Sequence, residues 1–367
     1  MNNRQRFLNC LLFKETDRLP RWEWAFLQEN AKPWLSQGLP EEVFNNESWV
    51  DFFKLDRGCG YANASMAEKA GVNVDLFPDF SGEIITEDED SITLISKWGG
   101  VVRTLKSGCS LPQYLDFGVK TSADFQKYKT RWNPDTPERY PSDWTSRKEK
   151  WKDRDYPVCI WAYGWYGLLR ELMGVENLSI AFYEDESLVF EILEFWSDFL
   201  IRVYEKALTE VDVDYVLFWE DLAFKNGPLL SPDTFRKFFL PQYKKVISSF
   251  KSHGMQIFMV DSDGRIDDII PLWIEGGVNV LAPFEVGAGM DIVKIRKKYG
   301  KDLAIIGGID KMKVAMAPET INEELELKVK PMLESGGYIP TLDHAVPFEM
   351  SLSNYLCYRN ELNRLSP

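Results

Sequence analysis

Two aspartates after one apolar run have the most specific spacing for chemistry in this chain. Asp261 and Asp263 follow "MQIFMV", residues 255–260, and one serine separates them. Residues i and i+2 of a strand point to the same side, so both carboxylates are expected to face one space. Like charges at this spacing repel each other, and a bound divalent cation relieves the repulsion. The spacing therefore predicts a metal site with these two aspartates as ligands.

A third ligand is expected from one of the 2 histidines in the chain. His344 ends the similar run "GGYIPTLDH", whereas His253 precedes a glycine at an expected helix end, where interaction with the helix dipole explains it. Two carboxylates and one imidazole suit Zn²⁺, Mn²⁺ or Fe²⁺, with zinc the suspected ion. The alternative is local: Asp263 before a glycine is also typical of a turn or a helix cap, and His344 can be structural.

Other acidic residues also end apolar runs, and aromatic residues reach 14% of the chain. If the runs are parallel strands, these acids meet at one end of the sheet, where crowding raises their pKa values. Aromatic side chains are expected to shape a cavity there, although filling the core is the alternative for most of them. The acids are Asp79, Glu220, Asp221, Glu285, Asp310 and Asp343, and the rings are Trp22, Trp24, Trp165, Tyr166 and Phe284.

Eight apolar runs indicate the elements that position these residues. Five of them recur at intervals of about 25–40 residues, the length of a strand and helix unit. Eight such units in one chain favour a closed (β/α)₈ barrel, with the site at the C-terminal ends of the strands. A doubly wound sheet is the rival, but no GxGxxG follows an early strand. The predicted strands are 18–24, 72–80, 157–164, 214–221, 255–264, 279–285, 303–310 and 336–344.

The helices between the runs have clear boundaries. In the predicted helix 231–254, Ser231 is a natural N-cap, Pro232 suits the first turn and Gly254 suits the end. Pro241 is expected to kink this helix. A second long amphipathic helix is predicted at 185–211. Residues 81–156, which alternate like a hairpin and then become rich in proline and tryptophan, are expected to be an insertion in a single domain of residues 1–367.

Composition narrows the class of protein. Against 43 basic residues stand 57 acidic ones, a net charge of −14, which argues against nucleic acid and anionic membranes as partners. No segment approaches the length of a membrane span, and the N-terminus lacks a long apolar stretch. The 5 cysteines are widely spaced and none forms a CxxC pair. A disulfide framework is therefore not expected, and we expect a cytoplasmic location.

Four segments resemble the uroporphyrinogen decarboxylase superfamily. They are "NRQRFLNCLLFKETDRLPRWEW", "EDLAFKNGPLLSPDTFRKFFLPQYKKVI", "GGID" and "GGYIPTLDHAVP", and the resemblance covers residues 4–362. It implies a (β/α)₈ barrel and two kinds of activity, porphyrinogen decarboxylation and methyl transfer with corrinoid proteins. The decarboxylases hold substrate carboxylates with paired arginines near the first strand, where this chain has Arg21 and Glu23. Asp79 and His344 resemble decarboxylase site residues, but an acidic mouth does not suit a substrate with many carboxylates.

The methyltransferase branch carries an HxC pair and a later cysteine that bind zinc. Aligned on the following glycine, HxCG falls on Asp261 to Gly264, and the later cysteine falls on or next to His344. The resemblance thus implies three ligands with oxygen and nitrogen in place of sulfur, which suit a substrate oxygen or amine better than a thiol. The expected function is transfer of a methyl group from a small methoxy or methylamine compound to a corrinoid on a partner protein. Glu220 or Asp221 is the expected general acid.

Two alternatives stay open at this point. One is a metal-independent decarboxylase of a tetrapyrrole or pyrrole-like acid, in which Asp79 and His344 position the substrate. The other is a binder of corrinoids or tetrapyrroles without catalysis. The substrate-binding residues expected for the enzyme are Arg21 and Glu285 together with the rings named above. The oligomeric state is open, and a homodimer is possible.

Overall fold

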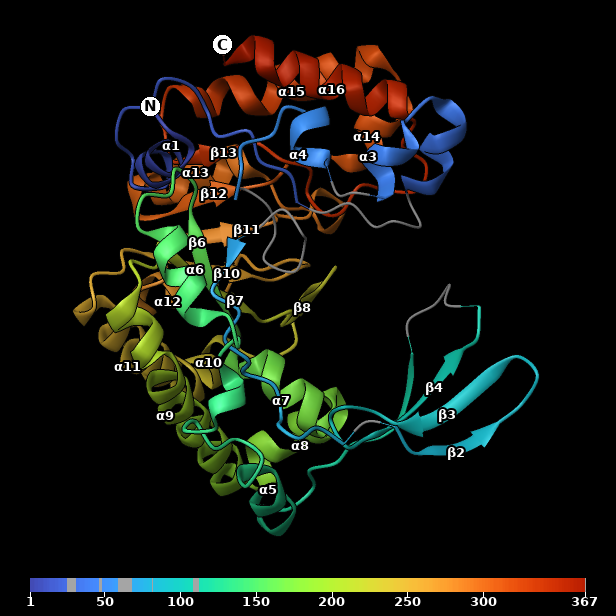
Figure 1. The fold of residues 1–367 in the computed structure, drawn as a ribbon, viewed down its shortest axis with the longest axis vertical. Helices are drawn as coiled ribbons and strands as arrows, with labels where there is room; N and C mark the ends of the chain where they lie inside the picture. The colour runs from blue at the N-terminus through green and yellow to red at the C-terminus, as the bar shows by residue number, and fades with distance from the viewer. Residues whose placement is uncertain (25–30, 46–47, 59–67, 81, 108–111, 367) are drawn as a thin grey trace.

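A curved sheet of seven parallel strands lies at the centre of the described chain in the computed structural model (Figure 1). The structure describes residues 1–366 except 25–30, 46–47, 59–67, 81 and 108–111. The strands are parallel throughout, so their C-terminal ends lie at one edge. In spatial order they are β1 (Glu68–Lys69), β6 (Val158–Tyr163), β7 (Tyr215–Trp219), β10 (Ile257–Asp261), β11 (Val280–Ala282), β12 (Ala304–Ile306) and β13 (Tyr338–Ile339).

Side chains alternate between the two faces of this sheet. On β10, Ile257 and Met259 join the cluster inside the curve, while Phe258 and Val260 join the larger core under the helices. This alternation follows from the period of two in a strand, and it directs Asp261 inward. The inner cluster is closed at the N-terminal end of the strands by α1 (Asn3–Leu11), since Phe7 packs on Tyr215, the first residue of β7. A site is therefore expected at the other end of the sheet, where the strands have their C-terminal ends.

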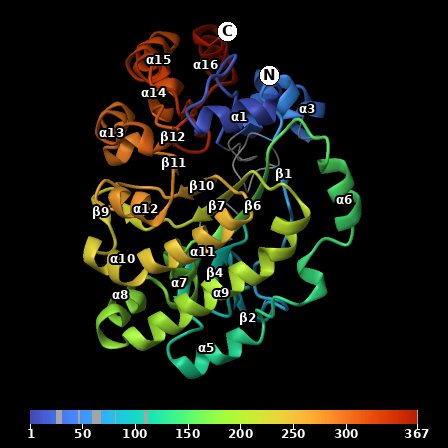
Figure 2. The ribbon, with the colours of Figure 1, turned by 90° about the vertical axis from the view of Figure 1, so that its left-hand side faces the viewer.

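The helices that connect the strands lie outside the curved sheet (Figure 2). The predicted helix 185–211 is confirmed as α9, which Asp185 caps through Leu188 N. The predicted helix 231–254 is two helices, because Pro241 cannot continue the hydrogen-bond pattern of the first. The helices outside the sheet are α7 (Trp165–Met173), α8 (Val175–Glu184), α9 (Glu186–Glu210), α10 (Pro232–Phe238), α11 (Leu240–Ser252), α12 (Ile270–Gly276), α13 (Ile292–Tyr299), α14 (Lys311–Met316), α15 (Pro318–Leu333) and α16 (Leu352–Leu365).

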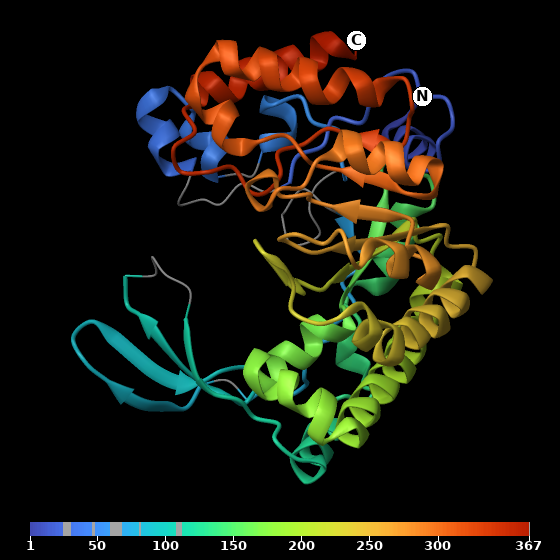
Figure 3. The same ribbon diagram turned by 180° about the vertical axis from the view of Figure 1, so that it is seen from behind.

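A four-stranded antiparallel sheet projects from the body where the insertion was predicted (Figure 3). The alternating sequence forms more than a hairpin, because two further strands continue the pairing. The strands are β2 (Ile84–Glu87), β3 (Ser91–Ile95), β4 (Val101–Leu105) and β5 (Gln113–Asp116), and α5 (Ser122–Lys129), η2 (Pro137–Arg139) and α6 (Trp144–Trp151) follow. The other short elements are η1 (Lys32–Gln37), α3 (Glu41–Asn45), α4 (Trp49–Phe52), β8 (Ala223–Phe224), β9 (Gly227–Pro228), η3 (Val286–Ala288) and η4 (Gly300–Asp302).

Two predicted strands are not found as predicted. Residues 72–80 contain no strand, and β1 lies earlier, at Glu68–Lys69. The carbonyl groups of Asn73 and Asp75 accept hydrogen bonds from the buried guanidinium of Arg139 instead of a neighbouring strand. In 18–24 one bridge residue, Glu23, is the extent of strand structure among the residues described. Trp22 and Trp24 nonetheless pack with the inward side chains of the sheet, so the described chain forms a curled, barrel-like parallel sheet of seven strands.

None of the described helices is both long and apolar enough to cross a membrane. Three of the cysteines fall in the described part of the chain, and all three are free: Cys10 and Cys159 are buried and Cys357 is half-buried.

Candidate functional site

Three aspartates meet where β7 and β10 end. Asp261 closes β10, where Trp219 of β7 is its neighbour in register, and Asp221 and Asp263 each lie two residues beyond this pair. One carboxylate oxygen of each of the three aspartates lies within 4.8 Å of the others. We call these three residues the aspartate cluster. Oxygen atoms at this separation can coordinate one cation, although acidic groups also gather at protein surfaces without one.

The backbone around the cluster is tightly constrained. Asp221 has a φ of 44°, in the left-handed region that costs energy for a residue with a side chain. Gly264, with a φ of 81°, lies so close to β8 that an added Cβ would be 2.6 Å from the carbonyl oxygen of Ala223. Ser262 Oγ accepts a hydrogen bond from Leu222 N at 3.3 Å and ties the two strand ends together. The aspartates are therefore held by their backbones.

Arg170 of α7 holds Asp221 in place. Its Nη1 donates to the backbone oxygen of Asp221 at 2.9 Å, and its Nη2 lies 3.6 Å from the carboxylate. Burial raises the pKa of Asp221, the nearby charge of Asp263 raises it further, and Arg170 opposes both effects. Asp221 Oδ1 also accepts from the backbone N–H of Asp263 at 3.2 Å. Asp221, at the end of β7, thus helps to orient Asp263, which follows β10.

His344 reaches the cluster through Asp263. Its Nε2 lies 3.3 Å from Asp263 Oδ2, and this contact raises the pKa of the imidazole against the opposing effect of burial. The preceding residue, Asp343, is almost fully buried and accepts from Val286 N at 2.8 Å and from Lys311 N at 3.1 Å. The chain that presents His344 is therefore fixed by its neighbour.

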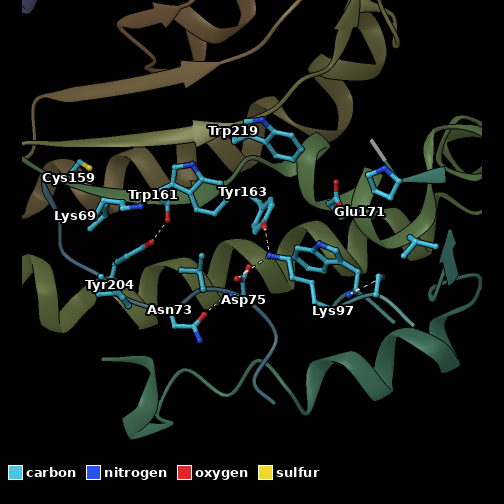
Figure 4. Close-up of a pocket in the computed structure, with 18 of the residues that line it drawn as sticks. Lys69, Asn73, Asp75, Lys97, Cys159, Trp161, Tyr163, Glu171, Tyr204 and Trp219 are labelled. Atoms are coloured by element: carbon cyan, nitrogen blue, oxygen red, sulfur yellow. Dashed lines mark hydrogen bonds and ion pairs between the residues drawn. The ribbon is translucent and has the colours of Figure 1, made fainter. Parts of the chain in front are cut away.

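A cavity of about 610 Å³ lies beside the cluster at the C-terminal end of β6 and β7 (Figure 4). The described residues that line it include Trp161, Tyr163 and Trp219 from the parallel strands and Trp98 from the turn between β3 and β4. Among the described residues, four charged side chains also line it: Lys69, Asp75, Lys97 and Glu171. The three aspartates are not part of this lining. Trp219 connects the two features, since it borders the cavity and pairs with Asp261 in the sheet.

Residues 112–364 match the family model described as uroporphyrinogen decarboxylase (URO-D), which is more than half of the chain. The chain belongs to the URO-D family. This membership agrees with the parallel sheet and with the site at the C-terminal ends of its strands. The resemblance described in the sequence analysis implies both decarboxylases and methyltransferases in this family, so the activity has to be argued from the site.

A solved structure titled "methyltransferase from Methanosarcina mazei" is similar over 100% of this chain and 99% of its own, with a TM-score of 0.62 and 14% identity. At this identity the similarity shows the fold alone. A B12-independent methionine synthase from Shewanella sp. W3-18-1 aligns with 60% of this chain and 64% of its own at 12% identity, and its TM-score of 0.35 is too low to indicate a shared fold. No curated protein sequence matches significantly.

Within this URO-D chain, the predicted ligands are only partly assembled as expected. Asp261 and Asp263 lie together, but the third member of the cluster is Asp221 rather than His344, which pairs with Asp263. Glu285, expected to bind substrate, accepts from Gly264 N at 2.9 Å and lies 3.6 Å from Lys311 Nζ. It supports the loop that follows the aspartates. That these residues bind a metal remains a prediction.

Glu220 lies away from the cluster, because odd-numbered residues of β7 point inward and Glu220 points outward. Its fully buried carboxylate accepts hydrogen bonds from three backbone N–H groups at the start of α7, at 2.8 to 3.1 Å, and one from the hydroxyl of Tyr243. Burial raises its pKa to about 7. Glu220 therefore stabilises a helix N-terminus and cannot reach a substrate at the mouth, so its prediction as general acid is not supported.

The predicted aromatic residues also lie outside the cavity lining. Trp165, Tyr166 and Phe284 are buried in the core under the helices. Trp22 and Trp24 fill the inside of the curved sheet. Asp79 is exposed, and Arg21 is half-buried near Asp56. These aromatic side chains therefore fill the core, which was the alternative considered for them.

The rings that do line the cavity follow a pattern that was available in the sequence. Trp161 and Tyr163 are i, i+2 neighbours at the end of the predicted strand 157–164, so alternation alone would have directed both toward the same face. Asp75, four residues before Asp79, borders the cavity from the segment mistaken for a strand. Trp98 had no comparable pattern, because only the packing of the inserted sheet brings it there.

Proposed function

We propose that this protein is a methyltransferase that removes a methyl group from a small methoxy or methylamine compound and transfers it to a corrinoid carried by a partner protein. The observation that supports this proposal is the aspartate cluster beside an aromatic cavity at the C-terminal ends of the strands. A cavity of about 610 Å³ has the size of a small-molecule site. In folds of this class, catalytic groups stand at that end of the sheet.

The cluster fits a divalent cation on its own chemistry. Burial and then the nearby charge of Asp263 raise the pKa of Asp221, and a cation held by the three carboxylates, whose ligand oxygens lie within 4.8 Å of one another, would offset this cost. Asp221, Asp261 and Asp263 would hold the ion, with His344 beside Asp263. An all-carboxylate set favours Mg²⁺ or Mn²⁺ over the zinc suspected from the sequence. Such an ion, when bound, withdraws electron density from the atom that carries the methyl group.

The residues of the chain have separate tasks in this proposal. The rings of Trp161, Tyr163 and Trp219 hold the donor and keep water from it. Arg170 fixes Asp221 by its backbone and side chain. His344, whose pKa is raised by its hydrogen bond with Asp263, can supply a proton from Nε2 to a leaving oxygen. The methyl group passes to the corrinoid, the leaving atom keeps the electron pair of the broken bond, and a proton neutralises it.

The test uses full-length protein purified without chelator. Metal content is measured by elemental analysis, and methyl transfer is followed by the absorbance change from cob(I)alamin to methylcobalamin with methoxybenzoate or trimethylamine as donor. We expect about one Mg²⁺ or Mn²⁺ per chain to be bound when the ion is supplied, and metal-dependent formation of methylcobalamin. Turnover that is unaffected by metal removal would refute the role of the cluster. Absence of transfer from every donor would refute the proposed function.

A further inference from the structure

Glu171 borders the cavity and has no partner among the residues that the structure describes. It lies near the C-terminal end of α7, and it makes no hydrogen bond or ion pair with any residue in the described part of the chain. Burial raises the pKa of its carboxyl group, with smaller opposing contributions from Arg170 and Lys97. Arg170 is already engaged, since it contacts Asp221 and lies 4.6 Å from the ring centre of Trp219. A carboxylate in this position favours a cation in the cavity.

The walls around Glu171 are aromatic. Tyr163 lies between Trp98 and Trp219, with ring centres 5.0 and 5.7 Å away, both nearly perpendicular to it. The charge of Glu171 contributes to the raised pKa of Tyr114, which also lines the cavity, so the two side chains are near each other. Rings of this kind attract ammonium groups through their negative faces, and methylated ammonium is the usual ligand of such aromatic cages.

The chain already places one ammonium group on these rings. Lys97 Nζ lies 5.3 Å from the ring centre of Trp98 and 5.8 Å from that of Tyr163, and Asp75 pairs with it at 3.3 Å (Figure 4). One part of the cavity is thus built as an alkylammonium site with a carboxylate counter-ion. Glu171 offers a second carboxylate beside the same rings, and no lysine of the described residues is paired with it.

An anionic ligand fits this end of the cavity poorly. It would lie between Asp75 and Glu171 and close to the aspartate cluster, whose three carboxylates carry more charge than one divalent ion neutralises. Two lysines of the described lining could attract an anion, but Lys97 is already paired with Asp75 at 3.3 Å, and Lys69 lies at the opposite end, near Cys159 and Trp161 (Figure 4). The balance of charge near Trp219 therefore favours a cation.

We propose that Glu171, together with Trp219, Tyr163 and Tyr114, binds a methylated ammonium group. Its role as the methyl donor rests on the function proposed above, whereas its binding does not. If such a compound is the donor, the carbon–nitrogen bond breaks, a neutral amine leaves with the electron pair, and the methyl group passes to the reduced corrinoid. No proton is required. The site thereby selects methylammonium compounds over neutral methyl ethers.

The experiment compares three ligands of similar shape by isothermal titration calorimetry on the full chain: choline, its neutral isostere 3,3-dimethylbutan-1-ol, and the anion 3,3-dimethylbutanoate. We expect choline to bind about tenfold or more tightly than the neutral compound. Glu171→Gln should remove most of this preference. Glu184→Gln is the matched control, because Glu184 is an exposed glutamate on α8 outside the cavity lining, and it should leave binding unchanged.

Each outcome decides the proposal. Equal binding of choline and the neutral isostere, or a preference for choline that survives in Glu171→Gln, would refute it. Tightest binding of the anion would assign the cavity to Lys69 and Lys97 instead. Thermal unfolding of each variant confirms that it is folded. Choline binding that depends on Glu171, combined with no methyl transfer from any donor, would leave this inference standing and refute the proposed function alone.

Discussion

Replacing Tyr243 with phenylalanine tests how the buried carboxylate of Glu220 is stabilised. The ring of Tyr243 packs against Trp165, and phenylalanine keeps this packing. The change removes the hydroxyl that donates to Glu220 and accepts from Trp273 Nε1 at 3.0 Å. A hydrogen bond to a charged group contributes about 1.5–3 kcal/mol, and an unsatisfied buried donor costs about 1–3 kcal/mol. Above the pKa of Glu220, the variant should therefore lose about 2.5–6 kcal/mol of unfolding free energy.

The loss should depend on pH with a definite sign. The pKa of Glu220 rises from 4.5 in the unfolded chain to about 7 in the fold, so its protonated form is favoured by folding. Its contribution is present below pH 4.5 and is lost as the pH rises to about 7, which at about 1.36 kcal/mol per pH unit amounts to about 3 kcal/mol. Below pH 7 the bond from Tyr243 is one between neutral groups, which contributes about 1 kcal/mol, so the substitution should cost less there.

The measurement is urea unfolding of wild type and Tyr243→Phe at about pH 5 and about pH 8. We expect the variant's deficit to be larger at the higher pH by about 0.5–2 kcal/mol. Trp273→Phe is the control, because it removes the indole donor and leaves the contact between Tyr243 and Glu220. A deficit for Tyr243→Phe that is equal at both pH values would refute the reasoning that this hydroxyl stabilises an ionised, sealed carboxylate.

Three further predictions concern the site. Asp263→Asn should reduce the affinity for Mg²⁺ or Mn²⁺ by about tenfold or more in calorimetry and keep the thermal stability, because it removes a ligand and one of three crowded charges. If the substitution has no effect, Asp263 is a turn or cap residue, since asparagine caps a helix about as well as aspartate. Gly264→Ala should lower the stability by more than about 1 kcal/mol in urea unfolding, because the new Cβ would lie 2.6 Å from a carbonyl oxygen at a φ of 81°, and an unchanged midpoint would contradict this close approach. Uroporphyrinogen should not be decarboxylated, because the mouth is acidic; coproporphyrinogen formed in an anaerobic assay would show otherwise.

Local patterns in the sequence determined much of the scaffold. Apolar runs with polar ends predicted six of the seven strands of the sheet, β6, β7 and β10 to β13, because a buried parallel strand needs a continuous apolar segment. Pro241 lies where one predicted helix is divided into α10 and α11, because proline has no N–H to continue the helical hydrogen bonds. The spacing of Asp261 and Asp263 put both on one face, since side-chain direction along a strand depends only on residue number.

Tertiary structure decided which side chains meet. Asp221 joins the cluster because β7 lies beside β10 and the chain turns back at a strained residue, whereas the adjacent Glu220 faces the opposite side and stabilises α7. The inserted sheet supplies Trp98 and Tyr114 to the cavity from a part of the chain whose sequence predicts a hairpin but not where it packs. Long-range pairing, which no local pattern encodes, placed Asp75 and Glu171 beside the rings and left Asp79 in solvent.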